Sequence, residues 1–322
     1  MEKETTGQPN IKKIFLQILF VTSSLILPGV DWVLFSWMHI LLPTLTFFIL
    51  VEQGLYKGNR ILVIGSILGC IGSFALGSMS LMVFALSLLP IGYVLAHSAG
   101  QNEGPVKSGA KAVAILCLCW GVLLSGIVTP GEIAPYNNII LAFNAGINEA
   151  IEYYRVNTSS SIEVDMMLET TFVQMKEVIP IIMPAILGGF ALLAVWFTAT
   201  VGNWMLGRKD VELQPWPHFQ TWQLPEKLIW PAIICAGATF APIALIKHVA
   251  INLLILSALV YSLQGFSITV FLMNKWKVPL LFRSFVYVMI VFQSFGTVLL
   301  LLLGIADTWL NLRKLPPSGT QN

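Results

Sequence analysis

The chain has 322 residues, of which 56% are hydrophobic and only 11% are charged, and its mean hydropathy is +0.80. Soluble domains carry roughly 25% charged residues, so this composition excludes a soluble globular fold and predicts a protein embedded in a lipid bilayer. The net charge of +2 is too small and too dispersed for a nucleic-acid partner, because no basic stripe is present to neutralise a row of phosphates.

The chemistry-bearing motifs of common enzymes are missing from the sequence. The four cysteines all lie inside apolar runs, so they indicate neither a disulfide framework nor a metal site. No HExxH, GxSxG or CxxC motif and no glycine-rich phosphate loop occurs. We therefore predict no metal, no organic cofactor and no catalytic residue, and we do not expect an enzyme.

The N-terminal third reads as a membrane region preceded by a polar segment. Residues 1–12 are polar and basic, and we expect them to be cytoplasmic. Residues 13–128 are predicted to hold five membrane helices, at 14–27, 32–51, two within 61–97, and 112–128. The run 61–97 is too long for one span, so we place a break near Gly77 and Ser78.

A stripe of small residues marks the first of the two helices in that long run. Gly65, Gly69 and Gly72 are spaced by four and three, which puts them on one helix face. Without side chains on that face, the backbone of another helix can approach closely. We predict that this face packs against a neighbouring helix.

Residues 129–178 break the apolar pattern and predict an amphipathic helical hairpin outside the membrane. Apolar residues recur at spacings of three and four on both sides of a polar linker. Ser160 and Glu163 have the spacing of a capping box for the second helix. The opposite faces carry the acidic residues Glu149, Glu152, Asp165, Glu169 and Glu177. Both a docked connector and a functional lid fit this pattern.

Residues 179–310 form the predicted C-terminal membrane region, followed by a polar tail at 311–322. Its predicted spans are 179–206, 228–246, 251–273 and 284–305, and a basic, tryptophan-rich loop occupies 207–227. With a cytoplasmic N-terminus, most basic residues fall on the cytoplasmic side, as the positive-inside rule requires. Nine crossings leave the basic tail on the other side, so we expect the first or the seventh span to be re-entrant. The prediction is an all-α polytopic bundle of eight to nine membrane helices.

Polar side chains inside apolar runs are the candidates for ligand binding, because such residues are costly in a membrane. They are His39, Ser257, Tyr261, Gln264 and Gln293. Three of them, Ser257, Tyr261 and Gln264, share one helix face at spacings of four and three. Hydrogen bonds between helices explain the same residues without any ligand.

A second group of residues lies near the predicted ends of spans. It comprises Trp222, Trp230, Asp307, Trp309 and Arg313. Tryptophan is enriched where a protein meets the membrane–water interface. We interpret this group as an interfacial clamp on the lipid bilayer, with docking of a membrane-protein partner as the alternative.

The C-terminal stretch also carries polar, aromatic and glycine residues in a characteristic order. They are Tyr261, Gln264, Gly265, Lys275, Arg283, Tyr287, Gly304, Asp307, Trp309 and Arg313. In this pattern the chain resembles the YybS-like family of bacterial multi-pass membrane proteins. More distantly, it is similar to the substrate-binding components of energy-coupling-factor transporters, although those components have fewer helices and a small-residue docking pattern that 14–27 lacks.

The resemblance implies a bacterial cytoplasmic membrane protein that binds or transports a small solute, with a partner in the membrane. The main hypothesis is therefore a small-solute binding or transport component. The alternative is a non-catalytic membrane scaffold or assembly partner within a protein complex. Internal repeats, which alternating-access transporters commonly contain, are not evident in the sequence, so binding without autonomous transport is the form we prefer.

Overall fold

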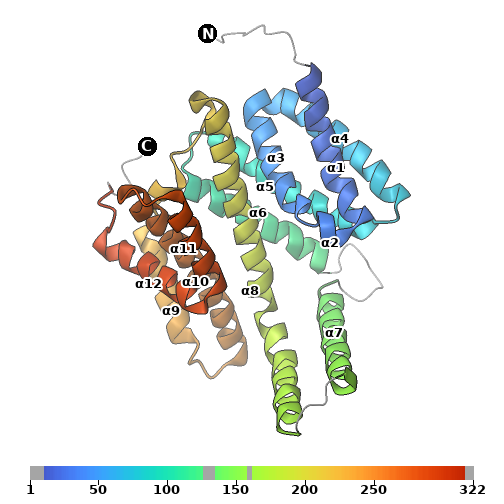
Figure 1. The fold of residues 1–322 in the computed structure, drawn as a ribbon, viewed down its shortest axis with the longest axis vertical. Helices are drawn as coiled ribbons and strands as arrows, with labels where there is room; N and C mark the ends of the chain where they lie inside the picture. Colours follow the sequence, from blue (N-terminus) through green and yellow to red (C-terminus); the bar gives the residue numbers. More distant parts are fainter. Residues whose placement is uncertain (1–10, 126–134, 158–161, 316–322) are drawn as a thin grey trace. The chain divides into compact units, whose positions relative to one another are not determined.

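The computed structural model describes residues 11–125, 135–157 and 162–315, and within these ranges all regular structure is helical. The helices are α1 (Ile11–Val30), α2 (Trp32–Phe35), α3 (Met38–Gln53), α4 (Leu55–Ala75), α5 (Met79–Gly100), α6 (Pro105–Leu124), α7 (Pro135–Asn157), α8 (Ile162–Lys209), α9 (Ile229–Ala238), α10 (Ala244–Lys275), α11 (Leu280–Phe292) and α12 (Ser294–Leu310) (Figure 1). Three short 3₁₀ turns, at Val211–Leu213, Phe219–Thr221 and Glu226–Leu228, lie between α8 and α9. The predicted all-α class is confirmed.

Seven helical segments in the described ranges are long and apolar enough to cross a membrane. They are Ile11–Val30, Trp32–Gln53, Leu55–Ala75, Met79–Gly100, Pro105–Leu124, Thr170–Lys209 and Ala244–Lys275. An eighth is added if α11 and α12, which are bent by 100° relative to each other, count as one broken span. The protein is thus a polytopic helical membrane protein with seven to eight candidate spans.

The seventh predicted span, at 228–246, is not one helix. In its place α9 has only ten residues, and a break with Pro242 separates it from α10. Ten helical residues measure about 15 Å, which is half of a hydrocarbon layer of about 30 Å. Hydropathy alone could not reveal this break, because apolar residues continue on both sides of it.

Two further boundaries differ from the prediction. The second helix of the amphipathic hairpin and the sixth span form one continuous helix, α8, of 48 residues. The last predicted span, at 284–305, is interrupted at Gln293, whose extended backbone ends α11 and begins α12. The predicted break near Gly77 is confirmed, since α4 ends at Ala75 and α5 begins at Met79. Ser160, the capping residue of the predicted capping box, lies outside the described residues.

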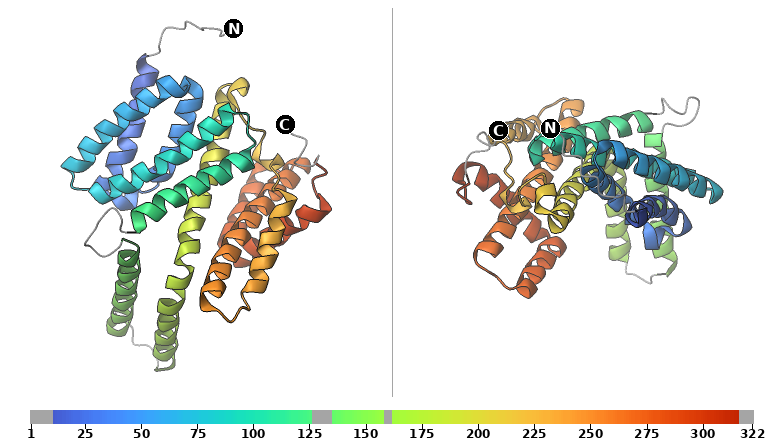
Figure 2. Two further views of the ribbon diagram at one scale, coloured as in Figure 1. Left: turned by 180° about the vertical axis from the view of Figure 1, so that it is seen from behind. Right: turned by 90° about the horizontal axis from the view of Figure 1, so that it is seen from above.

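The chain divides into two compact units. Unit 1 comprises Met1–Leu116 and Leu192–Trp222. Within it α3 is the inner helix, because it packs on α1, α4 and α5 and has the fully buried side chains Leu42 and Phe47 (Figures 1 and 2). These two side chains form part of the core of unit 1.

The predicted glycine face holds α4 against α1 in unit 1. A Cβ atom added to Gly65 or Gly69 would overlap Val21 or Leu25 of α1, and one added to Gly72 would overlap Ile26 in the same way. The backbones therefore approach more closely than side chains would allow. The packing role predicted for this glycine stripe is confirmed.

Unit 2 comprises Cys117–Ala191 and Gln223–Thr320, and its main contact is between α10 and α12. A Cβ atom on Gly265 would overlap the carbonyl oxygen of Leu300, and one on Gly304 would overlap that of Tyr261. The two helices therefore cross with their backbones in contact. This crossing places the polar residues of both helices beside each other.

Candidate functional site

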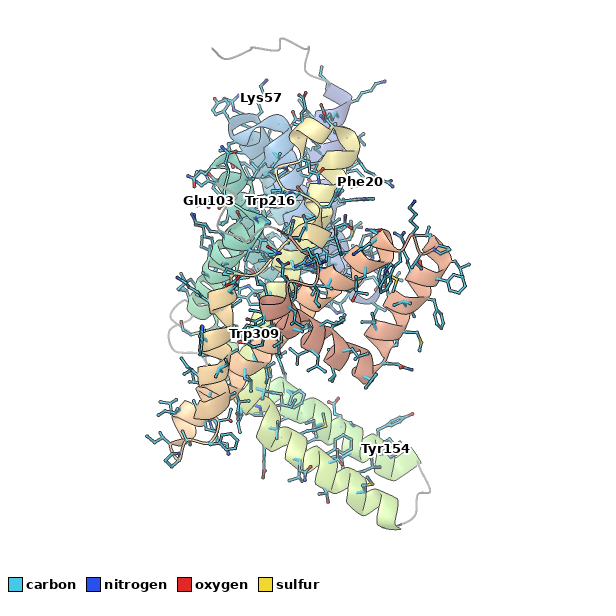
Figure 3. The ribbon with its side chains drawn as sticks, turned by 90° about the vertical axis from the view of Figure 1, so that its left-hand side faces the viewer. Phe20, Lys57, Glu103, Tyr154, Trp216 and Trp309 are labelled. Atoms are coloured by element: carbon cyan, nitrogen blue, oxygen red, sulfur yellow. The ribbon has the colours of Figure 1, made fainter. Side chains whose placement is uncertain are left out.

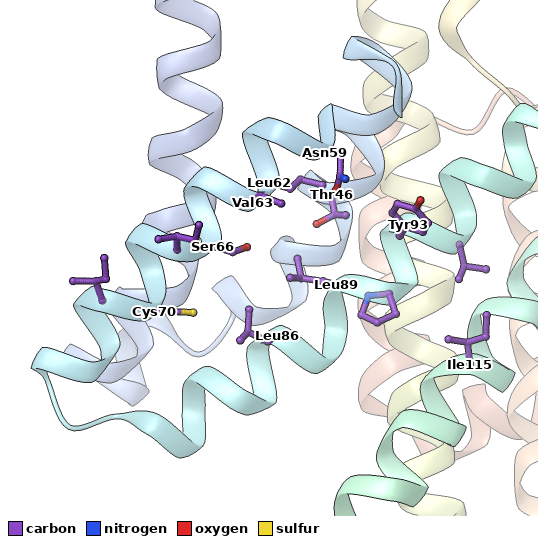
Figure 4. Close-up of a pocket in the computed structure, with 14 residues that line it drawn as sticks. Thr46, Asn59, Leu62, Val63, Ser66, Cys70, Leu86, Leu89, Tyr93 and Ile115 are labelled. Atoms are coloured by element: carbon purple, nitrogen blue, oxygen red, sulfur yellow. The ribbon is translucent and has the colours of Figure 1, made fainter. Parts of the chain in front are cut away.

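An open groove of about 770 Å³ lies in unit 1, between α4 and α5 (Figure 4). Its walls are formed mainly by apolar side chains of these two helices, and Thr46 of α3 and Ile115 of α6 complete it. The volume is within the range of roughly 300 to 1,000 Å³ that is usual for small-molecule sites. None of the ten residues predicted for ligand binding or docking lines this groove.

The groove exists because α4 and α5 are consecutive in the chain but pack chiefly on other helices. The glycine stripe described above holds α4 on α1. On α5, a Cβ atom at Gly92 would overlap Pro43 and Thr46, so the backbone of α5 lies directly against α3. The two helices thus separate from each other and leave Thr46 between them.

Three polar side chains gather at one end of the groove, and Ser66 lies midway along it. Asn59, Thr46 and Tyr93 lie together there, whereas Cys70 and Leu86 lie toward the other end (Figure 4). The Thr46 hydroxyl donates to the Leu42 carbonyl at 2.9 Å. Within the described residues, the Asn59 and Tyr93 side chains have no hydrogen-bond partner, so both are free to bind a polar group.

His39, the predicted ligand residue of unit 1, is buried with only 2% of its surface exposed. Its ring lies between Trp32 and Phe84, with centroid distances of 5.6 and 5.5 Å. Within the described residues neither ring nitrogen has a hydrogen-bond partner. His39 is therefore held by aromatic contacts.

The other four predicted ligand residues lie in unit 2. Tyr261 and Gln264 are buried on α10 where α12 crosses it. Ser257 instead donates to the Leu253 carbonyl of its own helix at 2.8 Å. Gln293 is exposed at the break between α11 and α12. The structure thus brings together Tyr261 and Gln264 of the predicted set.

Asp307 and Arg313 form a buried ion pair beside Gln264. Arg313 Nη2 and Gln264 Nε2 each lie 2.9 Å from Asp307 Oδ2, and Arg313 Nη1 donates to the Ser267 hydroxyl at 2.9 Å. The side chains of Arg313 and Asp307 are 0% and 3% exposed. These four residues form the buried polar cluster of unit 2.

The chain reverses direction at the end of α12 to build this cluster. Asn311 has a left-handed backbone with φ of 41°, a conformation that asparagine tolerates at the end of a helix. The following Leu312 N–H donates to Asp307 Oδ1 at 2.9 Å, and Arg313 then returns to α10. The cluster therefore fastens the residues after α12 to the helix crossing.

The tryptophans predicted as an interfacial group occupy two kinds of position. Trp230 and Trp309 are exposed, and Trp309 is visible on α12 in Figure 3. Trp222 is buried in unit 1, where its indole donates to the Pro217 carbonyl at 2.8 Å and its ring meets Trp216 edge to face. The position of Trp222 favours packing of the 207–227 loop over contact with lipid.

Asn252 of α10 is a structural residue that sequence reasoning missed. Its amide oxygen accepts from the Ala185 N–H at 2.7 Å, and its amide nitrogen donates to the Ile181 carbonyl at 2.7 Å. These two backbone groups are four residues apart in α8, next to Pro184, which lies inside the helix and has no N–H to donate. Asn252 thus binds the backbone of α8 beside Pro184. In the sequence, the prolines of α8 were the signal that could have pointed to a side chain such as Asn252 binding the backbone of this helix.

Glu52, at the end of α3, is a second missed residue. It forms an ion pair with Lys13 of α1 at 2.9 Å and another with Lys209 of α8, and it accepts from Gln17 at 2.8 Å. One carboxylate therefore joins three helices of unit 1. A single acidic residue ending an apolar run, with lysines near other run ends, is the signal that could have identified it.

The buried polar cluster of unit 2 and the groove of unit 1 suit different chemical roles. The cluster around Asp307 is buried and its charged groups pair with each other, which suits a structural fastening. The groove of unit 1 is open and apolar and has at one end two polar groups that no described residue hydrogen-bonds, which suits binding. The groove is thus the candidate functional site.

A family model described as "Predicted membrane protein (DUF2232)" matches residues 15–308 of the chain. The matched range includes the whole groove and Asp307, and it ends before Arg313. Comparison with curated proteins finds no match, and comparison with solved structures finds none.

Proposed function

We propose that this chain, which belongs to the predicted membrane protein family DUF2232, is a binding component for a small molecule with a substantial apolar part. The observation that carries the proposal is the groove between α4 and α5, with its apolar walls and its polar end at Asn59 and Tyr93. A groove between two candidate spans is accessible from the bilayer, so its ligand would enter from the lipid. Binding is the proposed activity, and transport is a further step that needs a partner.

The sequence resemblances are consistent with this proposal. Similarity to the YybS-like family and to substrate-binding components of energy-coupling-factor transporters favours a binding role in the bacterial cytoplasmic membrane. The basic residues favour a cytoplasmic N-terminus. In that orientation, the Asn59 end of the groove faces the cytoplasm.

The test is native mass spectrometry of the gently solubilised protein with a groove-filling variant. Cys70→Trp adds a large side chain to the groove, whereas Leu68→Trp adds the same side chain to an exposed position of α4 that does not line it. We expect the wild type and Leu68→Trp to retain a small molecule that Cys70→Trp loses. Equal retention by all three proteins would overturn the proposal.

A second candidate function is a membrane scaffold, and it rests on α7 and the start of α8. These helices are joined by a hydrogen bond of 2.6 Å from Lys176 to Asn148, and α7 exposes Tyr153 and Leu141. Figure 3 shows Tyr154 on the same helix. A retained protein subunit without any small molecule, lost on Tyr153→Ser, would favour the scaffold over the binding component.

A further inference from the structure

The polar end of the groove continues into a basic surface on α4. Arg60 precedes the groove residues Val63 and Ile67 by three and seven positions, so all three lie on one face of the helix. The Arg60 guanidinium lies 4.4 Å from the centre of the Tyr56 ring and hydrogen-bonds to the Tyr56 hydroxyl. Tyr56 therefore holds the positive charge of Arg60 beside the groove end.

This positive charge is not neutralised by a neighbouring carboxylate. Of the ion pairs among the described residues, none includes Arg60 or Lys57. The two carboxylates that form ion pairs in unit 1 already have lysine partners, since Glu52 pairs with Lys13 and Lys209, and Glu103 pairs with Lys107 and Lys111. An anionic group at the Arg60 end would thus meet an excess of positive charge.

The groove itself has the chemistry of a site for an alkyl chain. From Asn59 to Ile71 it follows α4 for twelve residues, which is about 18 Å. Beyond its polar end, the groove is lined mostly by aliphatic side chains. A ligand that fits both parts has an apolar chain and an anionic head.

We propose that the groove holds one acyl chain of an anionic phospholipid whose phosphate lies against Arg60. Asn59 and Tyr93 donate hydrogen bonds to the same head group. This inference rests on the proposed binding function and names the ligand class of that site. A zwitterionic phospholipid has the same chain, but the ammonium group of its head group compensates the charge of its phosphate, so Arg60 discriminates against it.

The experiment uses the full chain in phosphatidylcholine vesicles with two photoactivatable phospholipids. Both carry the same diazirine acyl chain, and one is a phosphatidylglycerol while the other is a phosphatidylcholine. After irradiation, labelled peptides are mapped by mass spectrometry. We expect the anionic probe to label the α4 and α5 groove peptides about fivefold more than the zwitterionic probe, the factor expected for one basic residue at an anionic surface.

Two arginine variants test the role of the charge. Arg60→Gln should bring the ratio between the two probes to about one, by the loss of that single charge. Arg208→Gln is the matched control, because Arg208 is also exposed and lies 4.4 Å from the centre of the Trp204 ring. It should leave the ratio unchanged. A preference that survives Arg60→Gln would overturn the inference.

The outcomes separate this inference from the proposed function. If both probes label the groove equally in the wild type and Cys70→Trp removes both signals, the groove binds acyl chains without selecting a head group. That result overturns the phospholipid assignment and leaves the binding function standing. If the groove peptides are labelled no more than the Leu68 face of α4, the phospholipid assignment is wrong, and the binding function then stands or falls with the retention of a small molecule by wild type and Cys70→Trp. Ile67→Trp provides a second groove-filling variant if Cys70→Trp does not fold.

Discussion

Removing one partner of the Asp307–Arg313 pair should strongly destabilise unit 2. Both side chains are almost wholly buried and lie 2.9 Å apart. Breaking a buried ion pair by removing one partner costs about 3–5 kcal/mol, because the remaining charge is left uncompensated. Each single alanine variant is therefore expected to lose about 3–5 kcal/mol of the free energy of unfolding.

The two single variants should not be equal. After Arg313→Ala, the Asp307 carboxylate keeps two hydrogen-bond donors, the Gln264 side chain and the Leu312 N–H. After Asp307→Ala, Arg313 keeps its bond to Ser267 but cannot lose its charge. We expect Asp307→Ala to cost about 5 kcal/mol and Arg313→Ala about 3 kcal/mol, the two ends of the usual range.

The assay is reversible unfolding in mixed micelles with increasing sodium dodecyl sulfate, followed by circular dichroism. The double variant Asp307→Ala, Arg313→Ala should lose less than the sum of the two single losses, by up to about 3 kcal/mol. Lys314→Ala, at the exposed neighbouring position, should change the stability by less than about 0.5 kcal/mol. Single variants within about 1 kcal/mol of the wild type would refute the reasoning.

Two further predictions concern Asn252 and Glu103. Asn252→Leu removes the two hydrogen bonds from its side chain to the backbone of α8, so it should cost about 1–3 kcal/mol in the same unfolding assay, and an unchanged midpoint would contradict this role. Hydrogen bonds from Lys107 and then from Lys111 lower the pKa of Glu103 from 4.5 to about 2. Because its folded pKa is depressed, the stabilisation by Glu103 should be present above pH 4.5 and be lost as the pH falls toward 2. Carbon-13 NMR of labelled glutamate should show the low pKa of Glu103. The double variant Lys107→Gln, Lys111→Gln should return this pKa toward 4.5, and an ordinary Glu103 pKa in the wild type would refute the role of the two lysines.

Much of the membrane organisation could be predicted because it depends on local composition. Long apolar runs identify spans, since a stretch of about 20 apolar residues is needed to cross the bilayer. The break at Gly77 and the packing face of Gly65 and Gly69 were also readable, because glycine acts through its missing side chain wherever it occurs. The same local signal explains the error at α9, whose apolar run continues past the end of the helix.

The candidate site was only partly accessible to such reasoning. The sequence drew attention to Gln264 and Asp307, which the structure joins by a hydrogen bond across the α10–α12 crossing. It gave Asp307 and Arg313 an interfacial position, and their burial became visible only when the chain after α12 was seen to turn back onto α10. The groove was missed entirely, because its walls are ordinary aliphatic residues.

The sequence by itself determined that this is an all-helical, multi-pass membrane protein, because an apolar chain in lipid must satisfy its backbone hydrogen bonds within its own segments. Only the tertiary structure decided which helices touch. It placed α4 on α1 and α5 on α3, and so opened the groove between two helices that follow each other in the chain. It also brought Asn252 against the backbone of α8 near Pro184, across a distance in sequence that no local pattern records. Contacts of this kind depend on close packing between surfaces of similar polarity, so composition and spacing do not specify them.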